Sequence, residues 1–167
     1  MSRTVRPARP ADFATVVAFN AALALESEGK ALDPATLDAG VAAALADPAK
    51  GTYTVAEDGG QLVGQCLVTV EWSDWRNGWF WWVQSVYVLP VARRTGVFRD
   101  LYRHLEADAA TRPDVIGVRL YVERDNARAR ATYESLGFVE EPYTLMARYP
   151  LPGRASAFRS GDAEPGA

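Results

Sequence analysis

Apolar residues spaced three and four positions apart predict four helices along the chain. Residue types that begin and end helices support these assignments. Asp33 before Pro34 is a favourable N-cap, and Pro48 closes the same helix. The four predicted helices cover residues 10–27, residues from 34 to the stop at Pro48, residues 96–110 and residues 126–137.

β-branched and aromatic runs bounded by turn residues predict the strands between these helices. A short first strand is predicted at residues 4–6, and residues 51–72 form a hairpin around the turn DGG. Further strands are predicted at residues 79–90 and 115–122, and one or two more within residues 138–150. The resulting order, β–αα–ββ–β–α–β–α–β, indicates an α/β fold with a central sheet covered on both faces.

The 167 residues, 49% hydrophobic and 23% charged, are typical of one soluble globular domain. We expect this domain to span residues 1–149, followed by a flexible tail over residues 150–167. The net charge of -3 argues against binding to nucleic acid or to anionic membranes. No apolar run approaches a membrane span, and the single cysteine, Cys66, fits a reducing compartment, so we expect a cytoplasmic protein.

A basic segment with one glycine stands where a predicted strand meets a predicted helix. Its sequence is RRTGVF, residues 93–98. The start of a helix exposes unpaired backbone N–H groups at the positive end of the helix dipole, and such groups bind anions. The alternative is an ordinary connection with solvated arginines, and these residues alone leave both interpretations open.

The last predicted helix carries a second informative pattern. Asn126 and Tyr133 lie seven residues apart, which is two helical turns, so both are expected on one face. Ala129 lies between them, and its small side chain leaves room for a ligand against the helix. The alternative is a tyrosine packed in the core with its hydroxyl group hydrogen-bonded.

Together, the two segments resemble the signatures of the GNAT superfamily of N-acetyltransferases. The first signature, Q/R-x-x-G-x-G/A, is met by residues 93–98, except that Phe98 replaces the usual Gly or Ala. The loop offers mainly backbone N–H groups, so a bulky side chain is tolerated there if it points into the core. The second signature, N-x-x-A-x-x-x-Y-x-x-x-G-F, is met by Asn126, Ala129, Tyr133, Gly137 and Phe138. The resemblance covers about residues 3–149.

The resemblance implies a mixed, mostly antiparallel sheet with a splayed strand pair and helices on both faces. It also implies that the anion is the pyrophosphate of coenzyme A and that acetyl-CoA is the acetyl donor. The residues that it places at the cofactor are Val86, Tyr87, Val88, Arg93, Arg94, Thr95, Gly96, Val97, Phe98, Arg99, Asn126 and Tyr133.

The chemistry implied by the resemblance is direct attack of a neutral amine on the thioester. A backbone N–H near residues 86–88 would stabilise charge on the carbonyl oxygen, and Tyr133 would protonate the departing thiolate as general acid. Gln84 stands where many relatives carry a glutamate, and glutamine cannot take a proton. The proton therefore leaves through water or a carboxylate, the candidates being Glu71, Asp74 and Glu123, each of which is otherwise an ordinary surface acid. His104 is expected to be structural.

In this superfamily the acceptor pocket lies between the first two helices and the sheet. The candidate acceptor-binding residues are Glu26, Glu28, Trp72, Asp74 and Gln84. Acidic and aromatic groups suit a cationic amine through charge and cation–π contacts, so we expect a small-molecule or amino-acid-like primary amine. No metal site is expected.

Two functions remain open from the sequence. The first is an acetyl-CoA-dependent N-acetyltransferase, and the second is a catalytically idle acyl-CoA-binding or regulatory module on the same fold. The presence of Tyr133 favours the enzyme, whereas Gln84 and Phe98 favour the idle module. Relatives are often dimers, so the resemblance also makes a homodimer a candidate assembly.

Overall fold

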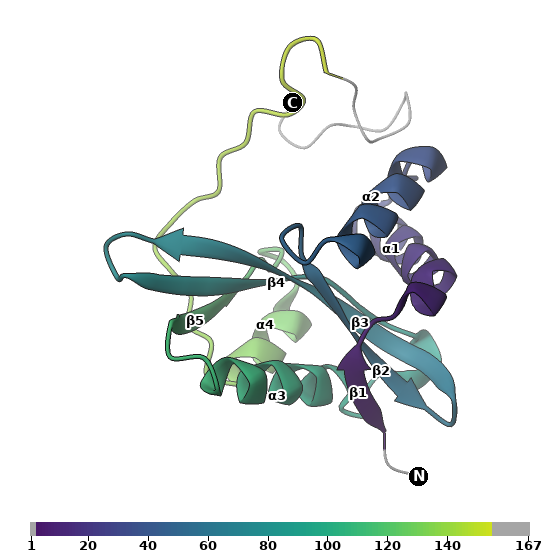
Figure 1. Ribbon diagram of the computed structural model, residues 1–167, viewed down its shortest axis with the longest axis horizontal. Coiled ribbons are helices and arrows are strands. Elements are labelled where there is room, and N and C mark those ends of the chain that lie inside the picture. Colours follow the sequence, from purple (N-terminus) through teal and green to yellow (C-terminus); the bar gives the residue numbers. More distant parts are fainter. Residues whose placement is uncertain (1–2, 155–167) are drawn as a thin grey trace.

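The computed structural model describes residues 3–154, which form a five-stranded sheet with helices on both faces (Figure 1). The elements are β1 (Thr4–Pro7), η1 (Pro10–Asp12), α1 (Phe13–Glu28), α2 (Pro34–Ala46), β2 (Thr52–Asp58), β3 (Gln61–Ser73), β4 (Gly78–Val88), η2 (Pro90–Ala92), α3 (Val97–Ala110), β5 (Val115–Leu120) and α4 (Ala127–Glu134). The predicted α/β class and the predicted helices are confirmed.

The strands follow one another across the sheet in chain order, from β1 to β5. The first three pairings are antiparallel, and β4 pairs with β5 in parallel. Parallel neighbours need a crossover connection, and α3 supplies it. The sheet is therefore mixed and mostly antiparallel, as the resemblance implied.

β4 separates from β5 before β4 itself ends. Their pairing stops at Val83 opposite Leu120, although β4 continues to Val88. In the same region the pairing between β3 and β4 shifts register, and Ser85 adopts the left-handed conformation with φ of 49°. Such bulges bend a strand away from its neighbour, so the final residues of β4 present an open edge.

Strand side chains alternate between two separate cores, one on each face of the sheet. On β2, Tyr53 and Val55 pack with Val16 of α1 and Val41 of α2. The other core contains Leu101 of α3 together with strand residues on the opposite side of the sheet. Figure 1 shows α1 and α2 on one side of the sheet and α3 with α4 on the other.

Helix ends agree with the capping residues in the sequence. The Asp33 carboxylate accepts a hydrogen bond from the backbone N–H of Thr36 at 2.8 Å, and α2 begins at Pro34 as predicted. The last helix is shorter than predicted, because α4 ends at Glu134 and Gly137 lies beyond it with φ of 89°. No helix among the described residues is long and apolar enough to cross a membrane.

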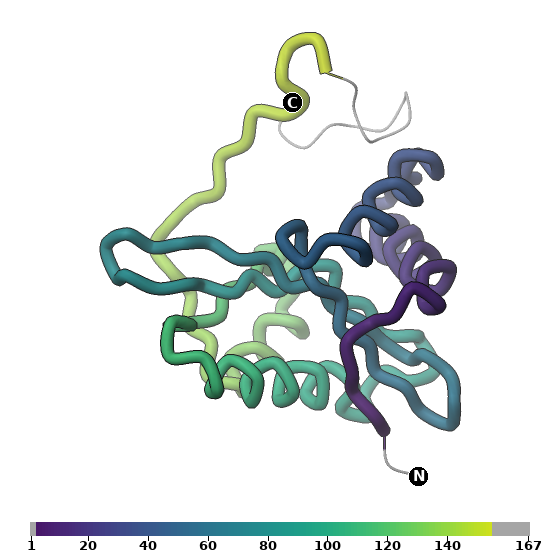
Figure 2. The backbone as a smooth tube through the Cα atoms, viewed as in Figure 1, coloured from purple at the N-terminus to yellow at the C-terminus, as the bar shows by residue number. Residues whose placement is uncertain are grey.

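The prediction of one or two strands within residues 138–150 is wrong for the described chain. Residues 138–154 contain no strand and run away from the sheet, as the tube in Figure 2 shows. Glu141 meets Arg119 of β5 at 3.5 Å, and the chain then leaves β5 instead of pairing along it. The alternating pattern is typical of a strand, but in this chain it does not pair with the outer edge of β5, which no described strand occupies. Most of the predicted tail, residues 155–167, lies outside the described residues.

Cys66 should not react with thiol reagents while the protein is folded. The side chain is fully buried on β3, and burial raises the pKa of the thiol to about 12, so the unreactive protonated form persists at pH 8. Titration with an aromatic disulfide reagent should give no signal in native buffer and one equivalent in denaturant. Rapid labelling of the native protein would contradict this burial.

Candidate functional site

A cavity of about 500 Å³ lies at the start of α3, between the loop after β4 and the helix α4. The loop and first turn of α3 contribute residues 92–99, and α4 contributes Arg128 and Thr132. Val88, at the end of the open edge of β4, also lines the cavity. The RRTGVF segment therefore faces α4, the helix of the second signature. The signature residues themselves, Asn126, Ala129, Tyr133, Gly137 and Phe138, do not line this cavity.

The backbone of the loop is shaped by two left-handed residues, Arg94 with φ of 68° and Gly96 with φ of 86°. Gly96 is the N-cap of α3, and no side chain caps this end of the helix. The first backbone N–H groups of a helix have no partner within the helix, so those of α3 are available to a ligand in the cavity. Gly96 suits this position because a side chain disfavours the left-handed conformation.

The cavity is cationic. Its lining includes four arginines and no carboxylate, counted among the described residues. The guanidinium groups of Arg94, Arg99 and Arg128 have no hydrogen bond or ion pair to any described residue. Three unpaired guanidinium groups beside the start of a helix make a site suited to a polyanion.

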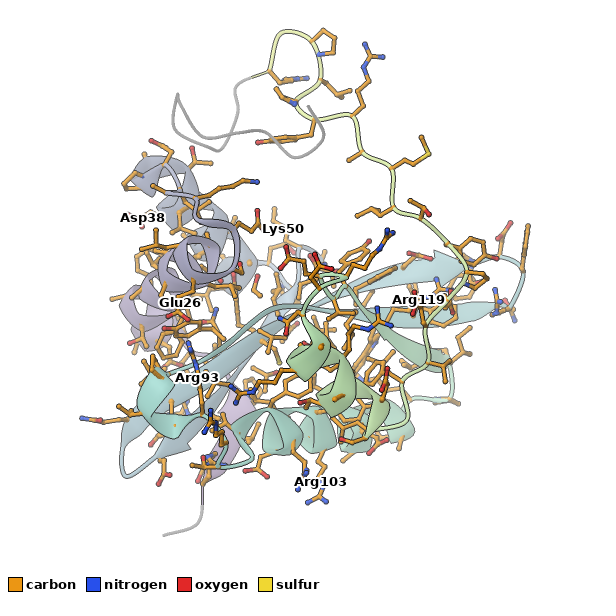
Figure 3. All side chains as sticks on the ribbon, turned by 180° about the vertical axis from the view of Figure 1, so that it is seen from behind. Glu26, Asp38, Lys50, Arg93, Arg103 and Arg119 are labelled. Carbon is orange, nitrogen blue, oxygen red and sulfur yellow. The ribbon has the colours of Figure 1, made fainter. Side chains whose placement is uncertain are left out.

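Arg93 differs from the other three arginines, because its guanidinium group is turned towards α1. Its Nε donates to the carbonyl oxygen of Val88 at 2.9 Å, and an Nη atom donates to the Glu26 carboxylate. The Tyr87 hydroxyl donates to the same carboxylate at 3.0 Å. These hydrogen bonds, from Arg93 first and Tyr87 second, lower the pKa of Glu26. Figure 3 shows Glu26 and Arg93 directed at one another.

The open edge of β4 carries backbone donors next to this cavity. The N–H of Leu89 donates to the Val63 carbonyl on β3 at 2.9 Å. Alternate N–H groups of a strand point to opposite edges, so the N–H of Val88 points to the edge that β5 has left. The Val88 carbonyl, which accepts from Arg93, lies on the same edge. This edge can pair with an extended ligand.

An aromatic cluster lies beside the cavity, and Phe98 is the member of it that lines the cavity. The Tyr133 ring lies 5.2 Å from Phe98 and 5.9 Å from Phe138, measured between ring centroids. Burial raises the pKa of Tyr133. Phe98 packs against the core below α3, the orientation that allows a bulky residue in this loop. Asn126 accepts from the Ala129 N–H at 3.0 Å and thus caps α4.

The candidate acceptor residues are scattered in the structure. Glu28 pairs with Lys30 at 2.9 Å at one end of α1. Trp72 lies on the β3–β4 hairpin, with its ring 5.0 Å from Trp79, and Asp74 accepts from the Trp75 N–H in the hairpin turn. This turn lies at the far end of the sheet from α1 and α2 (Figure 1).

Gln84 and the candidate base Glu71 are also held by neighbours. The Gln84 amide donates to Thr69 Oγ1 at 2.6 Å. Glu71 accepts from Trp82 Nε1 at 2.7 Å and from Arg119 at 3.0 Å. Neither side chain contributes to the cavities described here.

A second cavity, of about 400 Å³, lies between α1 and α2 on the opposite face of the sheet. Its polar floor consists of Asn20, Tyr53 and Ser85, none of which the sequence singled out. Of the five predicted acceptor residues, Glu28 is the one that lines it. An asparagine within the apolar run of α1 was a signal that could have identified this floor.

Comparisons with known proteins agree with this arrangement. The model of the Acetyltransferase (GNAT) family matches residues 19–138. A possible acetyltransferase from Clostridium difficile 630 is 42% identical, with 90% of this chain and 99% of that chain covered and a TM-score of 0.83. No curated protein matches the sequence.

Two more distant structures share the fold. The ribosomal-protein-alanine N-acetyltransferase from Brucella melitensis is 19% identical, covering 89% of this chain and 99% of its own, with a TM-score of 0.71. A predicted acetyltransferase with acetyl-CoA from Clostridium acetobutylicum is 18% identical, covering 88% and 96%, with a TM-score of 0.72. The family match spans both signatures and both faces of the sheet. The chain belongs to the GNAT family of acetyltransferases.

Proposed function

We propose that this protein is an acetyl-CoA-dependent N-acetyltransferase that acetylates the primary amine of a small-molecule or amino-acid-like acceptor. The observation that carries the proposal is the cationic cavity at the start of α3. Arg94, Arg99 and Arg128 are unpaired there, and no described carboxylate competes for them. A pyrophosphate fits this donor set, because its oxygens accept both from backbone N–H groups and from guanidinium groups.

Acetyl-CoA would supply a thioester whose acetyl carbon is open to attack by an amine. The chain would hold this donor through the loop at residues 94–98 and through the open edge of β4. The N–H of Val88 lies on that edge and is a candidate donor to the thioester carbonyl oxygen or to the pantetheine arm. That the neighbour from Clostridium acetobutylicum is described with acetyl-CoA supports this assignment.

Tyr133 is the proposed general acid. As the amine nitrogen bonds to the acetyl carbon, the carbon–sulfur bond breaks and the sulfur takes the hydroxyl proton of Tyr133. The proton lost by the amine passes to water, and solvent restores the tyrosine. A tyrosine hydroxyl is protonated at neutral pH, as a proton donor must be, and the Tyr133 ring contacts Phe98 of the loop that would hold the acetyl donor.

The decisive experiment follows thiol release from acetyl-CoA with a panel of amines. Release that depends on an amine, with an N-acetylated product seen by mass spectrometry, would establish the enzyme. The idle-module alternative predicts that coenzyme A binds and raises the melting temperature while no amine is acetylated. Absence of any heat or thermal shift with millimolar coenzyme A would contradict both functions.

We further propose that two copies of the chain associate as a homodimer. The outer edge of β5 has no strand partner among the described residues. Residues 143–149 carry Tyr143, Leu145 and Ala147 at alternate positions, as a half-buried strand would. Tyr143 is 78% exposed and Leu145 69% exposed in the single chain. Pairing of this segment with β5 of a second copy would give the edge of β5 a strand partner. It would also bury the apolar side of residues 143–149.

A matched pair of substitutions tests the dimer. Leu145→Lys places a charge on the apolar side of residues 143–149 and should convert a dimer to a monomer in light scattering. Met146→Lys adds the same charge on the opposite side, where the residue is 90% exposed, and should leave the mass unchanged. A monomeric wild-type protein at high concentration would contradict the assembly.

A further inference from the structure

Arg3, the residue before β1, reaches the loop that precedes α3. One Nη atom donates to Thr95 Oγ1 at 2.8 Å. The other donates to the Thr95 carbonyl oxygen at 3.4 Å and to the Asp100 carboxylate. The Arg3 side chain is only 12% exposed, and Figure 1 shows β1 beside the start of α3, where these contacts lie. The first described residue of the chain is therefore bonded to the loop of the cationic cavity.

The contact with the Thr95 carbonyl sets the direction of the peptide group that follows. In a trans peptide the carbonyl and the N–H of the next residue point in opposite directions. Because the Thr95 carbonyl is turned towards Arg3, the Gly96 N–H is turned away from it. Gly96 lines the cationic cavity, whereas Arg3 does not. Thr95 Oγ1 also donates to the Ala92 carbonyl at 2.8 Å, so the Arg3 contact supports a loop that is bonded to itself.

Asp100 is the acidic residue in the first turn of α3. A carboxylate there is attracted by the same end of the helix dipole that would attract a phosphate group, and the two negative charges repel one another. Arg3 forms an ion pair with Asp100, and the Asp58 carboxylate lies 3.9 Å from the same guanidinium group. The positive charge of Arg3 therefore offsets the negative charge of Asp100 close to the cationic cavity.

Arg6 makes a comparable set of ion pairs in another part of the protein. It lies on β1 and donates to Asp12 at 2.7 Å and to Glu57 at 3.0 Å, with a side chain that is 16% exposed. Neither carboxylate belongs to the loop at residues 94–98 or lines the cationic cavity. Arg6 thus matches Arg3 in charge and burial without contacting the loop.

We propose that Arg3 is a positioning residue for coenzyme A. It holds the loop at residues 94–98 in the binding conformation through Thr95, and it neutralises Asp100 so that the start of α3 accepts a pyrophosphate. This inference rests on the proposed acetyltransferase function and adds to it a residue that lies outside both sequence signatures. Because Arg3 acts through the loop, its loss should change the affinity for the cofactor and leave the chemical step unchanged.

The first test compares Arg3→Met with Arg6→Met by calorimetric titration of coenzyme A. Both substitutions remove a half-buried guanidinium group, so both should lower the melting temperature. Arg3→Met should raise the Kd about 10-fold, the order expected for a lost hydrogen bond to a charged group, and Arg6→Met should bind as the wild type does. Unchanged affinity in Arg3→Met, or equal losses in the two variants, would overturn the inference.

Lysine variants give the same comparison if either methionine variant fails to fold. Lysine keeps the positive charge but lacks the planar fork that lets Arg3 bond to Thr95 and Asp100 together. Arg3→Lys should therefore weaken coenzyme A binding by a smaller but measurable factor, whereas Arg6→Lys should not weaken it. Equal affinities in the two lysine variants would contradict the proposal.

The second test determines whether Asp100 carries part of the effect. Arg3→Met is measured in the wild-type protein and in Asp100→Asn, which completes a double-mutant cycle. The weakening caused by Arg3→Met should be about 3-fold smaller in Asp100→Asn, because no unpaired carboxylate then opposes the phosphates. The same weakening in both backgrounds would mean that Arg3 does not act through Asp100, and the inference would fail.

Kinetics and binding together separate a failure of this inference from a failure of the proposed function. With an amine that is acetylated, Arg3→Met should raise the KM for acetyl-CoA and leave kcat and the KM for the amine near wild type. A lower kcat with an unchanged KM for acetyl-CoA would overturn the inference but keep the enzyme. Calorimetry needs no turnover, so a loss of affinity specific to Arg3→Met would support the inference even in an idle module. A wild-type protein that binds no coenzyme A would overturn both.

Discussion

Tyr133→Phe should lower the turnover rate by about 10²–10⁴, the range typical of a lost general acid, while coenzyme A affinity stays nearly unchanged. The substitution keeps the ring, with its contacts to Phe98 and Phe138, and removes the hydroxyl group alone. Steady-state kinetics of thiol release, together with a calorimetric titration of coenzyme A, measure both quantities.

Tyr102 provides a matched control for this variant. Its ring belongs to the same aromatic cluster, 5.1 Å from Phe138 and 6.3 Å from Phe98, but it projects from α3. Tyr102→Phe should leave turnover within a few-fold of wild type. If Tyr133→Phe also retains full activity and loses only about 1 kcal/mol of stability, Tyr133 is a packing residue and water protonates the thiolate.

Gly96→Val should weaken coenzyme A binding by about 10- to 100-fold. The residue has φ of 86°, where a β-branched side chain is strained, and it caps the helix whose N–H groups are proposed to hold the pyrophosphate. The variant should either distort the loop or crowd the approach of the phosphates, and both effects reduce affinity. Calorimetry at fixed salt concentration measures the change.

Gly59→Val is the control that distinguishes a specific loss of coenzyme A binding from the general effect of backbone strain. Gly59 lies in the β2–β3 turn with φ of 57°, and, as at Gly96, an added Cβ meets nothing within 4 Å. Both variants should lose thermal stability, but Gly59→Val should bind coenzyme A as the wild type does. Equal losses of affinity in the two variants would show that the loop at residues 94–98 has no special part in binding.

The elements that the sequence predicts correctly are those set by contacts between residues close together in the chain. The start of α2 is set by Asp33 and Pro34 through contacts within four residues, and both are legible in the sequence. Residues 143–149 show the limit of such signals. Their alternation indicates a strand, but whether a strand forms depends on a partner edge elsewhere, which no local pattern specifies.

The candidate site likewise has one part that local motifs predict and another part that they do not. The cationic cavity involves two segments that contiguous motifs identify, the RRTGVF loop and α4. The floor of the second cavity joins Asn20 to Tyr53 and Gln65, residues 33 and 45 positions apart. Their meeting depends on how α1 crosses the sheet and on the bulge at Ser85. The sequence instead favoured Trp72 and Asp74, which the long β3–β4 hairpin carries away from α1.

The bridge from Glu26 to Arg93 has a thermodynamic consequence for two-substrate binding. Arg93 belongs to the loop of the cationic cavity, whereas Glu26 belongs to α1, which lines the second cavity. A phosphate that drew Arg93 into the cationic cavity would release Glu26 and alter the position of α1. Linkage then requires the effect to be reciprocal: whatever factor the first ligand imposes on the affinity of the second, the second imposes on the first. The effect of each substrate on the affinity for the other would thus pass through a single ion pair between Glu26 and Arg93.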